Sequence, residues 1–293
     1  MEMEHTMKNC WMLVNLEKEH APQCACRAAE LLLELGYQVW MEDTLLVIDP
    51  PRAVRLSTAQ RCLSQADFLV AVGGDGTIIH TAKYAVQRDI PLLGINAGHL
   101  GFLAQLEAHE VEKLPELLTS GCEVQSRMIL QARVFSQSGE ELERVCALNE
   151  VLLSKGSAAK IVDLEVTCQG KPVSSYRADG IILSTAIGST GYALSAGGPI
   201  LDPCVDCISM TPVCPHSLFG RSIVFAPDQE LRIQGKYINN TESLVLSIDG
   251  EAARKIHPGD YVLVRRSEKR VKFLCVEGRD FYEILNEKIM TRG

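Results

Sequence analysis

The stretch Phe68-Leu-Val-Ala-Val-Gly-Gly-Asp-Gly-Thr77 places a glycine-rich turn directly after an apolar run. The five residues from Phe68 to Val72 show no polar alternation, which predicts a strand buried on both faces of a parallel sheet. After the turn, apolar residues recur at helical spacing from Ile78 to Val86. We therefore predict a strand, a glycine turn and a helix, with a ligand site at the carboxyl end of the strand.

The residue types in this turn suit a phosphate group. Gly73, Gly74 and Gly76 let a phosphate approach the backbone closely, and the first N–H groups of the following helix can bind an anion. Asp75 needs a different explanation, because a carboxylate repels phosphates. It fits a magnesium ligand or a base that removes a hydroxyl proton. The alternative is a tight turn in which Asp75 only caps the helix.

Length and composition indicate a globular protein of one large or two ordinary domains. The chain has 293 residues, of which 46% are hydrophobic and 23% are charged. The net charge of −8 argues against a general nucleic-acid binder. No apolar run approaches the roughly 20 residues that span a bilayer. The acidic start of the chain lacks a signal-peptide pattern, so we expect a cytoplasmic location without nucleic-acid or membrane partners.

The eleven cysteines are odd in number and scattered along the chain. This pattern predicts reduced thiols packed as small hydrophobic groups. The alternative is a zinc site at Cys204, Cys207, Cys214 and His216, whose spacing is short and crowded by two prolines. We expect no fixed metal site in the protein.

Residues 1–126 alternate between strand and helix patterns, which predicts a Rossmann-like parallel α/β domain. Besides the strand and helix around the glycine turn, strands are expected at Cys10–Asn15, Tyr37–Met41 and Pro91–Asn96. Helices are expected at Ala21–Leu35, Leu56–Ala66 and Val111–Thr119.

Residues 127–275 form short β segments broken by Gly, Pro, Asn and Ser, which predicts an all-β, sandwich-like domain. The expected strands are Ile129–Phe135, Val145–Leu153, Ile161–Cys168, Ile181–Ser184, Ile223–Ala226, Leu244–Ile248, Tyr261–Arg265 and Val271–Val276. Residues 276–293 contain a helical pattern over Tyr282–Met290, and we expect them to pack back on the α/β domain.

Three polar clusters interrupt the β segments: Asn149-Glu150, Arg177-Ala-Asp-Gly180 and Gly188-Ser-Thr-Gly-Tyr-Ala-Leu-Ser195. Small hydroxyl residues between glycines suit contact with a sugar or a phosphate. The alternatives are a solvated strand end for the first cluster and a helix cap at Ser189 or Thr190 for the third. Separately, Asp249-Gly250 predicts a hairpin turn.

Together these motifs resemble the NAD kinase family, whose members phosphorylate NAD to NADP. The resemblance covers nearly the whole chain. The glycine turn alone is shared with diacylglycerol and sphingosine kinases and nearly with phosphofructokinases, whereas the later motifs are more specific in this order. The matching motifs are Gly73-Gly-Asp-Gly-Thr77, Gly98-His-Leu-Gly-Phe102, Asn149-Glu150, Ala178-Asp-Gly180, Gly188-Ser-Thr-Gly-Tyr192, Cys214-Pro-His-Ser-Leu218 and Asp249-Gly250.

The resemblance implies roles for the matching residues. Asp75 would be the catalytic base and the carboxylate on the magnesium side, and Asn149 and Glu150 would bind the hydroxyls of the adenosine ribose. Asp179 would contact the nicotinamide side, and Phe102 would lie near the adenine. The other implied NAD-binding residues are Gly76, His80, Lys160, Arg177, Thr190, Gly191, Tyr192, Ala193, Leu194 and Ser195. The implied phosphate or ATP side consists of Gly73, Gly74, Thr77, Asp249 and Gly250.

The resemblance also implies a reaction and partners. The γ-phosphoryl group of ATP would pass to the 2′-hydroxyl of the adenosine ribose of NAD, with Mg²⁺ or another divalent cation accompanying ATP. Polyphosphate is an alternative donor. The family forms homodimers or homotetramers in which a neighbouring subunit contributes to the pocket. We expect Asp75 to face the Asn149-Glu150 pair across the bound ribose.

Three positions depart from the family pattern, the first of them being Ala186, which stands where the family commonly has a proline. Ile187 replaces a residue with a hydroxyl group, which removes one polar contact, and Gly191 replaces an alanine, which would loosen the backbone. Two other functions are considered: a lipid kinase that shares the glycine turn, and a non-catalytic NAD(H)-sensing protein. The sensor would bind NAD without forming NADP.

Overall fold

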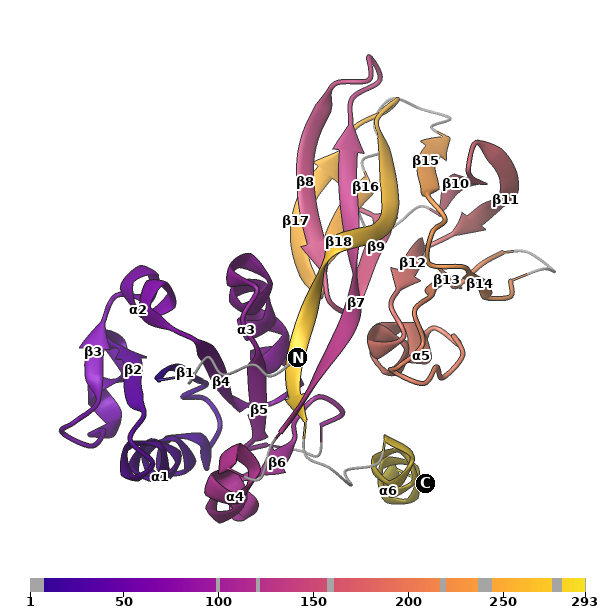
Figure 1. Ribbon diagram of the computed structural model, residues 1–293. Helices are drawn as coiled ribbons and strands as arrows, with labels where there is room; N and C mark the ends of the chain where they lie inside the picture. Colours follow the sequence, from indigo (N-terminus) through magenta and orange to yellow (C-terminus); the bar gives the residue numbers. More distant parts are fainter. Residues whose placement is uncertain are drawn as a thin grey trace. The chain divides into compact units, whose positions relative to one another are not determined.

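The computed structural model describes residues 8–98, 101–119, 122–156, 161–216, 220–236, 244–275 and 281–292 (Figure 1). The chain forms two compact units. Unit 1 consists of Met1–Ser126 with Val271–Gly293, and unit 2 consists of Arg127–Arg270.

Unit 1 is built on a parallel sheet in the strand order β3-β2-β1-β4-β5. These strands are β1 (Asn9–Val14), β2 (Gln38–Glu42), β3 (Arg55–Ser57), β4 (Phe68–Gly73) and β5 (Leu92–Asn96). Beyond β5 lie β6 (Leu106–Glu107) and the end of β18 (Tyr261–Cys275), which pairs with β5 at Phe273 and Leu92. Every residue of β4 and β5 is buried, which confirms the expectation drawn from the apolar run.

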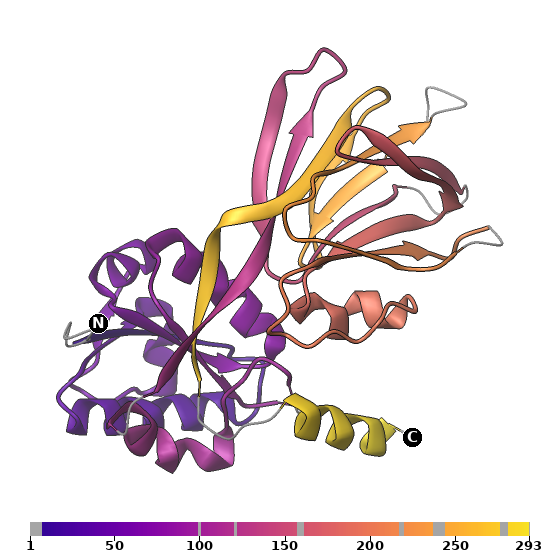
Figure 2. The same cartoon turned by 45° about the vertical axis from the view of Figure 1, so that its right-hand side comes forward.

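Helices cover both faces of this sheet. Figures 1 and 2 show α1 and α4 on one face and α2 and α3 on the other. Their bounds are α1 (Ala21–Glu34), α2 (Ala59–Gln65), α3 (Asp75–Arg88) and α4 (Leu114–Thr119). The face under α1 and α4 contains the main core cluster of the unit, including Met12, Val70 and Ile95. The predicted α/β domain is therefore present.

Two helix predictions in unit 1 need correction. Leu56 does not belong to a helix but lies in β3, where it pairs with Met41, and α2 begins only at Ala59 after the extended residue Thr58. The predicted helix Val111–Thr119 starts earlier, because the capping box of Glu107 and Glu110 begins a 3₁₀ helix, η2 (Ala108–Lys113), ahead of α4. A further 3₁₀ helix, η1 (Asp43–Ile48), follows β2.

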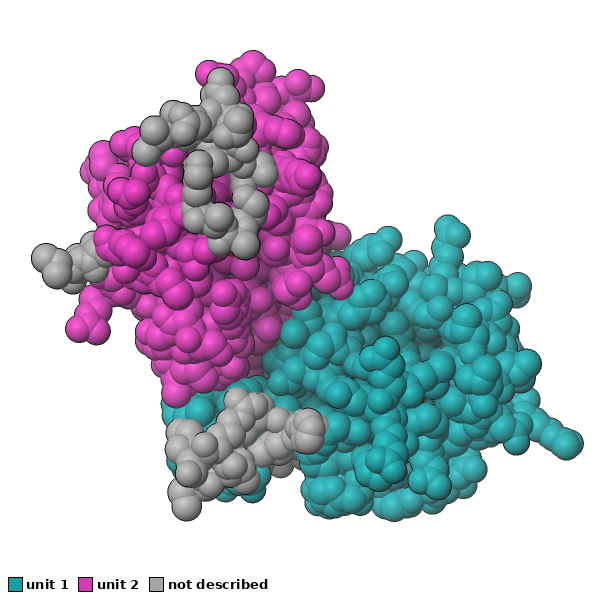
Figure 3. All heavy atoms as spheres, turned by 180° about the vertical axis from the view of Figure 1, so that it is seen from behind, with its two compact units in different colours: residues 1–126, 271–293 teal, residues 127–270 magenta. Residues whose placement is uncertain are grey.

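Unit 2, magenta in Figure 3, consists of two antiparallel sheets with one core between them. The first sheet contains β7 (Glu123–Phe135), β8 (Glu141–Ala147), β10 (Val162–Cys168), β11 (Lys171–Ala178), β15 (Leu231–Lys236) and β18. The second contains β9 (Glu150–Lys155), β12 (Gly180–Ser184), β13 (Ile208–Val213), β14 (Ile223–Phe225), β16 (Leu244–Ile248) and β17 (Glu251–Ile256). Leu164 of the first sheet and Ile181 of the second belong to the same buried cluster, which confirms the sandwich-like class.

The strand boundaries in unit 2 differ from the sequence prediction at several places. The segment Val145–Leu153 is two strands, β8 and β9, because the chain leaves the first sheet at Leu148 and enters the second. Conversely, Tyr261–Arg265 and Val271–Val276 belong largely to the single strand β18. Strands β11, β13, β15 and β17 have no counterpart among the expected strands. The hairpin prediction is confirmed, since Asp249 and Gly250 have φ of 51° and 83° at the β16–β17 turn.

The helix predicted over Tyr282–Met290 is α6 (Phe281–Arg292), and the ring of Phe281 lies 5.9 Å from that of Phe102. Among the helices of the described residues, none combines the length and the apolar character needed to cross a bilayer.

Candidate functional site

The glycine turn holds Asp75 in a fixed position. Strand β4 ends at Gly73, Gly74 is the N-cap of α3, and Asp75 is the first residue of the helix. Asp75 is therefore not the cap, and the capping alternative is wrong. Its carboxylate instead accepts the backbone N–H of Phe102 at 3.0 Å and that of Leu103 at 3.2 Å, one on each oxygen. These two bonds tie the half-buried carboxylate to the loop between β5 and β6.

Two glycines are required for this arrangement. A Cβ atom at Gly73 would lie 2.3 Å from Oγ1 of Thr77, and one at Gly101 would lie 2.3 Å from Oδ1 of Asp75. Gly76 differs, because no atom lies within 4 Å of the position its Cβ would occupy. The turn is thus closed on the side of Thr77 and open beside Gly76, where a ligand can approach.

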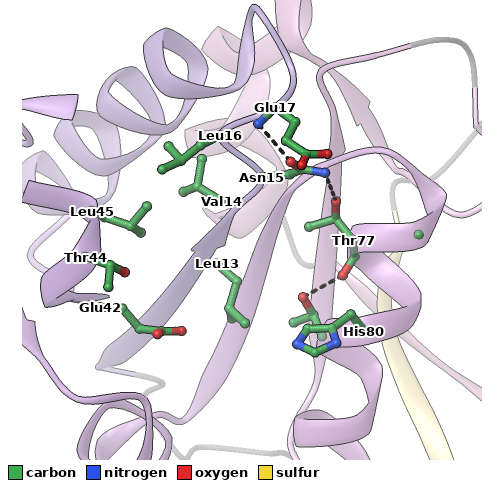
Figure 4. A pocket seen from close by; sticks show the side chains of 12 residues that line it. Leu13, Val14, Asn15, Leu16, Glu17, Glu42, Thr44, Leu45, Thr77 and His80 are labelled. Carbon is green, nitrogen blue, oxygen red and sulfur yellow. Dashed lines mark hydrogen bonds between the residues drawn. The ribbon is translucent and has the colours of Figure 1, made fainter. Parts of the chain in front are cut away.

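A pocket of about 540 Å³ lies beside the turn. In Figure 4, Asn15, Thr77 and His80 lie on one side of it, opposite Thr44 and Leu45. Asn15 donates from Nδ2 to Oγ1 of Thr77 at 3.3 Å, so the end of β1 is joined to the first turn of α3. The pocket therefore brings together three predicted site residues, which are Gly76, Thr77 and His80.

Lys18 is a residue of this region that the sequence reasoning missed. Its Cε lies 3.8 Å from the Cβ position of Gly74, and its Cδ and Cε lie 3.5 Å from that of Gly98. The stem of the side chain thus lies along two glycines of the site. Within the part of the chain that the structure describes, the Lys18 ammonium has no carboxylate partner. The sequence did contain a signal for Lys18, which is its position shortly after β1. Strands β1 and β4 are parallel neighbours, so their carboxyl ends, and the residues that follow them, lie at the same edge of the sheet.

In unit 2, Asp249 shapes the loop that carries Asn149 and Glu150. Its carboxylate accepts the backbone N–H groups of Leu148, Asn149 and Glu150 at 2.9, 2.7 and 3.1 Å. Asp249 and Gly250 thus lie beside the Asn149-Glu150 pair, at the turn between β16 and β17. Their contact with the ATP side remains a prediction.

The Asn149-Glu150 pair carries two buried acceptor atoms without partners. No described residue bonds to Oδ1 of Asn149 or to Oε2 of Glu150. Glu150 is only 7% exposed, and burial, followed by the negative charge of Asp249, raises the pKa of its carboxyl to about 7. Unpartnered buried acceptors are rare in proteins. This pair is suited to a ligand that donates hydroxyl hydrogens.

The segment after β12 approaches this pair closely. A Cβ atom at Gly188 would lie 2.1 Å from the carbonyl oxygen of Asn149. At Gly191 it would lie 3.5 Å from both Nδ2 of Asn149 and Oε2 of Glu150. The glycines of the third polar cluster therefore let its backbone lie against the pair.

The third polar cluster folds as η3 (Ile187–Thr190) and α5 (Tyr192–Ser195). Neither helix has a side-chain cap, so the capping alternative at Ser189 or Thr190 is wrong. The Thr190 hydroxyl donates to the carbonyl oxygen of Ile187 at 3.2 Å. Ala193 is buried, whereas Tyr192, Leu194 and Ser195 are exposed.

The remaining predicted residues lie elsewhere in each unit or outside the described residues. Asp179 precedes β12, at the opposite end of that strand from Ser184, and its Oδ1 pairs with Nζ of Lys155 at 2.7 Å. Arg177 is exposed on β11, and Lys160 lies outside the described residues. In unit 1, the ring of His80 is 5.5 Å from that of Tyr84. Also outside the described residues are His99, Leu100, Ser217 and Leu218 of the family motifs.

All eleven cysteines are free thiols, and most are buried or half-buried, as predicted. Burial raises the pKa of Cys24 and of Cys62 to about 11, so these thiols are protonated and inert at neutral pH. Across the described ranges, which include Cys204, Cys207, Cys214 and His216, no group of three or more His, Cys, Asp or Glu residues could hold a metal ion.

An α/β unit with a carboxylate in a glycine turn, together with a β-sandwich unit, agrees with the two-domain kinase class that the sequence resemblance implies. Two family models identify the family within this class. Residues 11–122 match the ATP-NAD kinase N-terminal domain, and residues 148–276 match the ATP-NAD kinase C-terminal domain. The chain belongs to the ATP-NAD kinase family, and the lipid-kinase alternative is set aside.

Similar proteins agree with this assignment. The NAD kinase of Citrifermentans bemidjiense is 40% identical over 277 residues, which cover 93% of this chain and 96% of the relative. That of Geobacter sulfurreducens is 36% identical over 280 residues, covering 93% and 95%.

Two solved structures share the fold. The crystal structure of yeast NADH kinase complexed with NADH has a TM-score of 0.86 at 23% identity and covers 98% of this chain and 88% of the yeast chain. The structure of an NAD kinase from Archaeoglobus fulgidus in complex with ATP has a TM-score of 0.73 at 24% identity and covers 98% and 99%.

Proposed function

We propose that this chain transfers the γ-phosphoryl group of ATP to the 2′-hydroxyl of the adenosine ribose of NAD, giving NADP. The observation that carries the proposal is the pair of buried, unpartnered acceptors on Asn149 and Glu150. A ribose offers two neighbouring hydroxyl donors, and hydrogen bonds to a charged acceptor are the stronger kind. The pair would therefore hold the ribose while its 2′-hydroxyl reacts.

Asp75 is the proposed base. Each of its oxygens accepts one backbone N–H, which fixes the plane of the carboxylate and leaves further lone pairs free to accept a proton. Asp75 would take the proton from the 2′-hydroxyl as that oxygen attacks the γ-phosphorus and ADP leaves. A positioned base of this kind contributes about 10²–10⁴-fold to the rate.

The glycine turn and Lys18 would bind the phosphate chain of the donor. Gly74 and Gly76 leave room for phosphate oxygens at the first N–H groups of α3, and the Lys18 stem passes Gly74. Phosphoryl transfer depends mainly on positioning and on neutralising charge, and a lysine beside the turn supplies a positive charge. These groups would contact the phosphates of the donor and not its adenine. Polyphosphate is therefore a second proposed donor.

The donor set also fits a divalent cation that arrives with ATP. Mg²⁺ is commonly held by one or two carboxylates together with substrate phosphates, and Asp75 retains lone pairs for such a contact. When bound, the cation neutralises charge on the triphosphate. Asp75 is the residue of this chain that would hold it.

We further propose that the enzyme is a homodimer or homotetramer in the cytoplasm. Tyr192 and Leu194 of the proposed NAD site are 46% and 37% exposed, which supports a second copy covering them. The free thiols support a reducing compartment. Light scattering on the purified chain would give the assembly, and a monomer at micromolar concentration would refute this part.

The function is tested by incubating the full chain with NAD, ATP and magnesium chloride and detecting the product with an NADP-specific dehydrogenase. The proposal predicts NADP formation that depends on all three. A second reaction with polyphosphate in place of ATP tests the donor. NAD binding without any NADP from either donor would favour the sensor alternative.

A further inference from the structure

Three polar side chains form a row across the second sheet of unit 2. Ser184 of β12 lies directly opposite Glu150 of β9 and, on its other side, directly opposite Ser209 of β13. Residues that are directly opposite in antiparallel strands point to the same face of the sheet. The sequence neighbours Val151 and Leu183 point to the opposite face, where they join the sandwich core.

All three residues of this row are buried and carry an atom without a partner. Ser184 and Ser209 are 0% and 1% exposed. Their Oγ atoms, like Oε2 of Glu150, bond to no described residue. Buried hydroxyls are nearly always hydrogen-bonded. Three unpartnered atoms on three adjacent strands therefore point to one shared network.

The spacing of the row allows this network. Cβ atoms of directly opposite residues lie about 4.5–5.5 Å apart, a separation at which serine hydroxyls pair across strands. The longer Glu150 side chain can reach the hydroxyl opposite it, either directly or through one enclosed water molecule. A serine hydroxyl can donate one hydrogen bond and accept another, so two serines in rotamers that point along the row can form a chain of donors toward Glu150.

We propose that Ser184 and Ser209 are positioning residues for Glu150. Ser209 donates its hydroxyl hydrogen to Ser184, and Ser184 donates to Oε2 of Glu150, whose second lone pair is left for a hydroxyl of the ribose. This inference rests on the proposed role of Glu150 in holding that ribose. Such donors stabilise the ionised carboxylate and oppose the effect of its burial.

The charged surroundings of Glu150 make the effect of the row measurable. Asp249, on the turn between β16 and β17, is the charged group that raises the pKa of Glu150 in addition to burial. The opposing segment η3–α5 presents Gly191, and residues 187–195 carry no charged side chain. On the neighbouring strand β12, the residue directly opposite Glu150 is the uncharged Ser184. Removing the hydroxyls therefore leaves burial and Asp249 unopposed.

The test compares the pH dependence of NAD affinity in the full chain and in the variants Ser184→Ala, Ser209→Ala and the double variant. Loss of a donor to a carboxylate raises the pH midpoint, and we expect a shift of about one pH unit for the double variant. Ser184→Thr retains a hydroxyl and should keep the wild-type midpoint. Ser247→Ala is the matched control, because Ser247 lies on the same face opposite Leu152, outside the row, and should also leave it unchanged.

A second readout needs neither ligand nor activity. Carbon-13 NMR of labelled glutamate in the free protein, with the Glu150 signal assigned by its loss in Glu150→Gln, should show the same upward shift. A double variant whose Glu150 titrates at the wild-type midpoint would overturn the inference. If Ser184→Ala fails to fold, Ser209→Ala alone must still raise the midpoint. Absence of NADP formation by the wild-type chain would refute the proposed function and leave the NMR result to decide on the row.

Discussion

The two units treat their key carboxylates in opposite ways. In unit 1, both oxygens of Asp75 accept backbone N–H groups of the loop at Phe102 and Leu103. In unit 2, Oε2 of Glu150 is buried without a partner, while neighbouring Asp249 accepts three backbone N–H groups. A carboxylate with such donors is fixed in place by the fold, whereas one without backbone donors keeps acceptor capacity for a ligand.

This difference separates positioning from recognition. Asp75 has its orientation set before any substrate arrives, as a base needs. Glu150 retains an unsatisfied acceptor, which costs stability but strengthens binding to a hydroxyl donor. The comparison predicts that changes at Asp75 affect turnover and changes at Glu150 affect binding and stability.

The largest expected effect is that of Asp75→Asn on turnover. The amide keeps the shape of the side chain but cannot accept the hydroxyl proton, so the rate of NADP formation should fall by about 10²–10⁴-fold. Circular dichroism should show a folded protein. Asp89→Asn, at the other end of α3, is the control and should retain the wild-type rate. Unchanged turnover in Asp75→Asn would remove Asp75 from the mechanism.

Next in size is the pH-dependent effect of Glu150→Gln on stability. Because the pKa of Glu150 is raised from 4.5 to about 7 in the fold, its contribution to stability is fully present below about pH 4.5 and is lost as the pH rises through 7. Near pH 5 the Glu150 carboxyl should therefore add little difference between the free energies of unfolding of the two proteins. Near pH 8 the free energy of unfolding of Glu150→Gln should have risen relative to wild type by up to roughly 3 kcal/mol.

Urea unfolding of both proteins at the two pH values measures that gain. At each pH, the difference between the free energies of unfolding of wild type and Glu150→Gln gives the contribution of Glu150, because the other titrating groups are the same in both proteins. An equal difference at both pH values would show that the carboxylate is not held in an unfavourable environment.

A steric change at Gly188 should have a smaller effect. An alanine there would place its Cβ 2.1 Å from the backbone oxygen of Asn149, so the loop or η3 must move. We expect a loss of about 1–3 kcal/mol in the free energy of unfolding, as for other overpacked sites. NAD affinity should fall as well, because the displaced loop carries the pair that is proposed to bind the ribose. Titration calorimetry measures the NAD affinity, and chemical denaturation measures the free energy of unfolding. Wild-type values for both would contradict the close packing of Gly188 against Asn149.

The smallest effect is expected for Gly191→Ala, which restores the usual family residue. Gly191 has a φ of −91°, outside the region that favours glycine, and its Cβ position is no closer than 3.3 Å to any neighbour. The substitution should change stability by less than about 1 kcal/mol and can raise it by restricting the unfolded chain. A loss of NAD affinity as large as that of Gly188→Ala would show that the glycine is needed there.

The fold class and the glycine turn could be predicted because their signals are local. The apolar run from Phe68 to Val72 and the Asp249-Gly250 pair each specify their structure within a few residues. Strand β11, with the sequence KPVSSYRA, lacks such a signal because its outward positions are polar and its pairing partner decides its conformation.

Several site contacts depend on topology and could not be read from sequence. Asp249 holds a loop about a hundred positions earlier in the chain, since β16 lies beside β9. Strand register alone places Ser184 opposite Glu150 and Ser209 opposite Ser184. Lys18 belongs to no motif, although it follows the strand next to the glycine turn.

The most direct test of this account is the affinity for NAD of Asp75→Asn and Glu150→Gln, measured side by side by titration calorimetry near pH 8. The account predicts wild-type affinity for Asp75→Asn and about a tenfold loss for Glu150→Gln, because Glu150 is the carboxylate proposed to hold the ribose, whereas the proposed role of Asp75 is proton transfer during the reaction. The reverse result, with NAD binding lost at Asp75 and retained at Glu150, would contradict it.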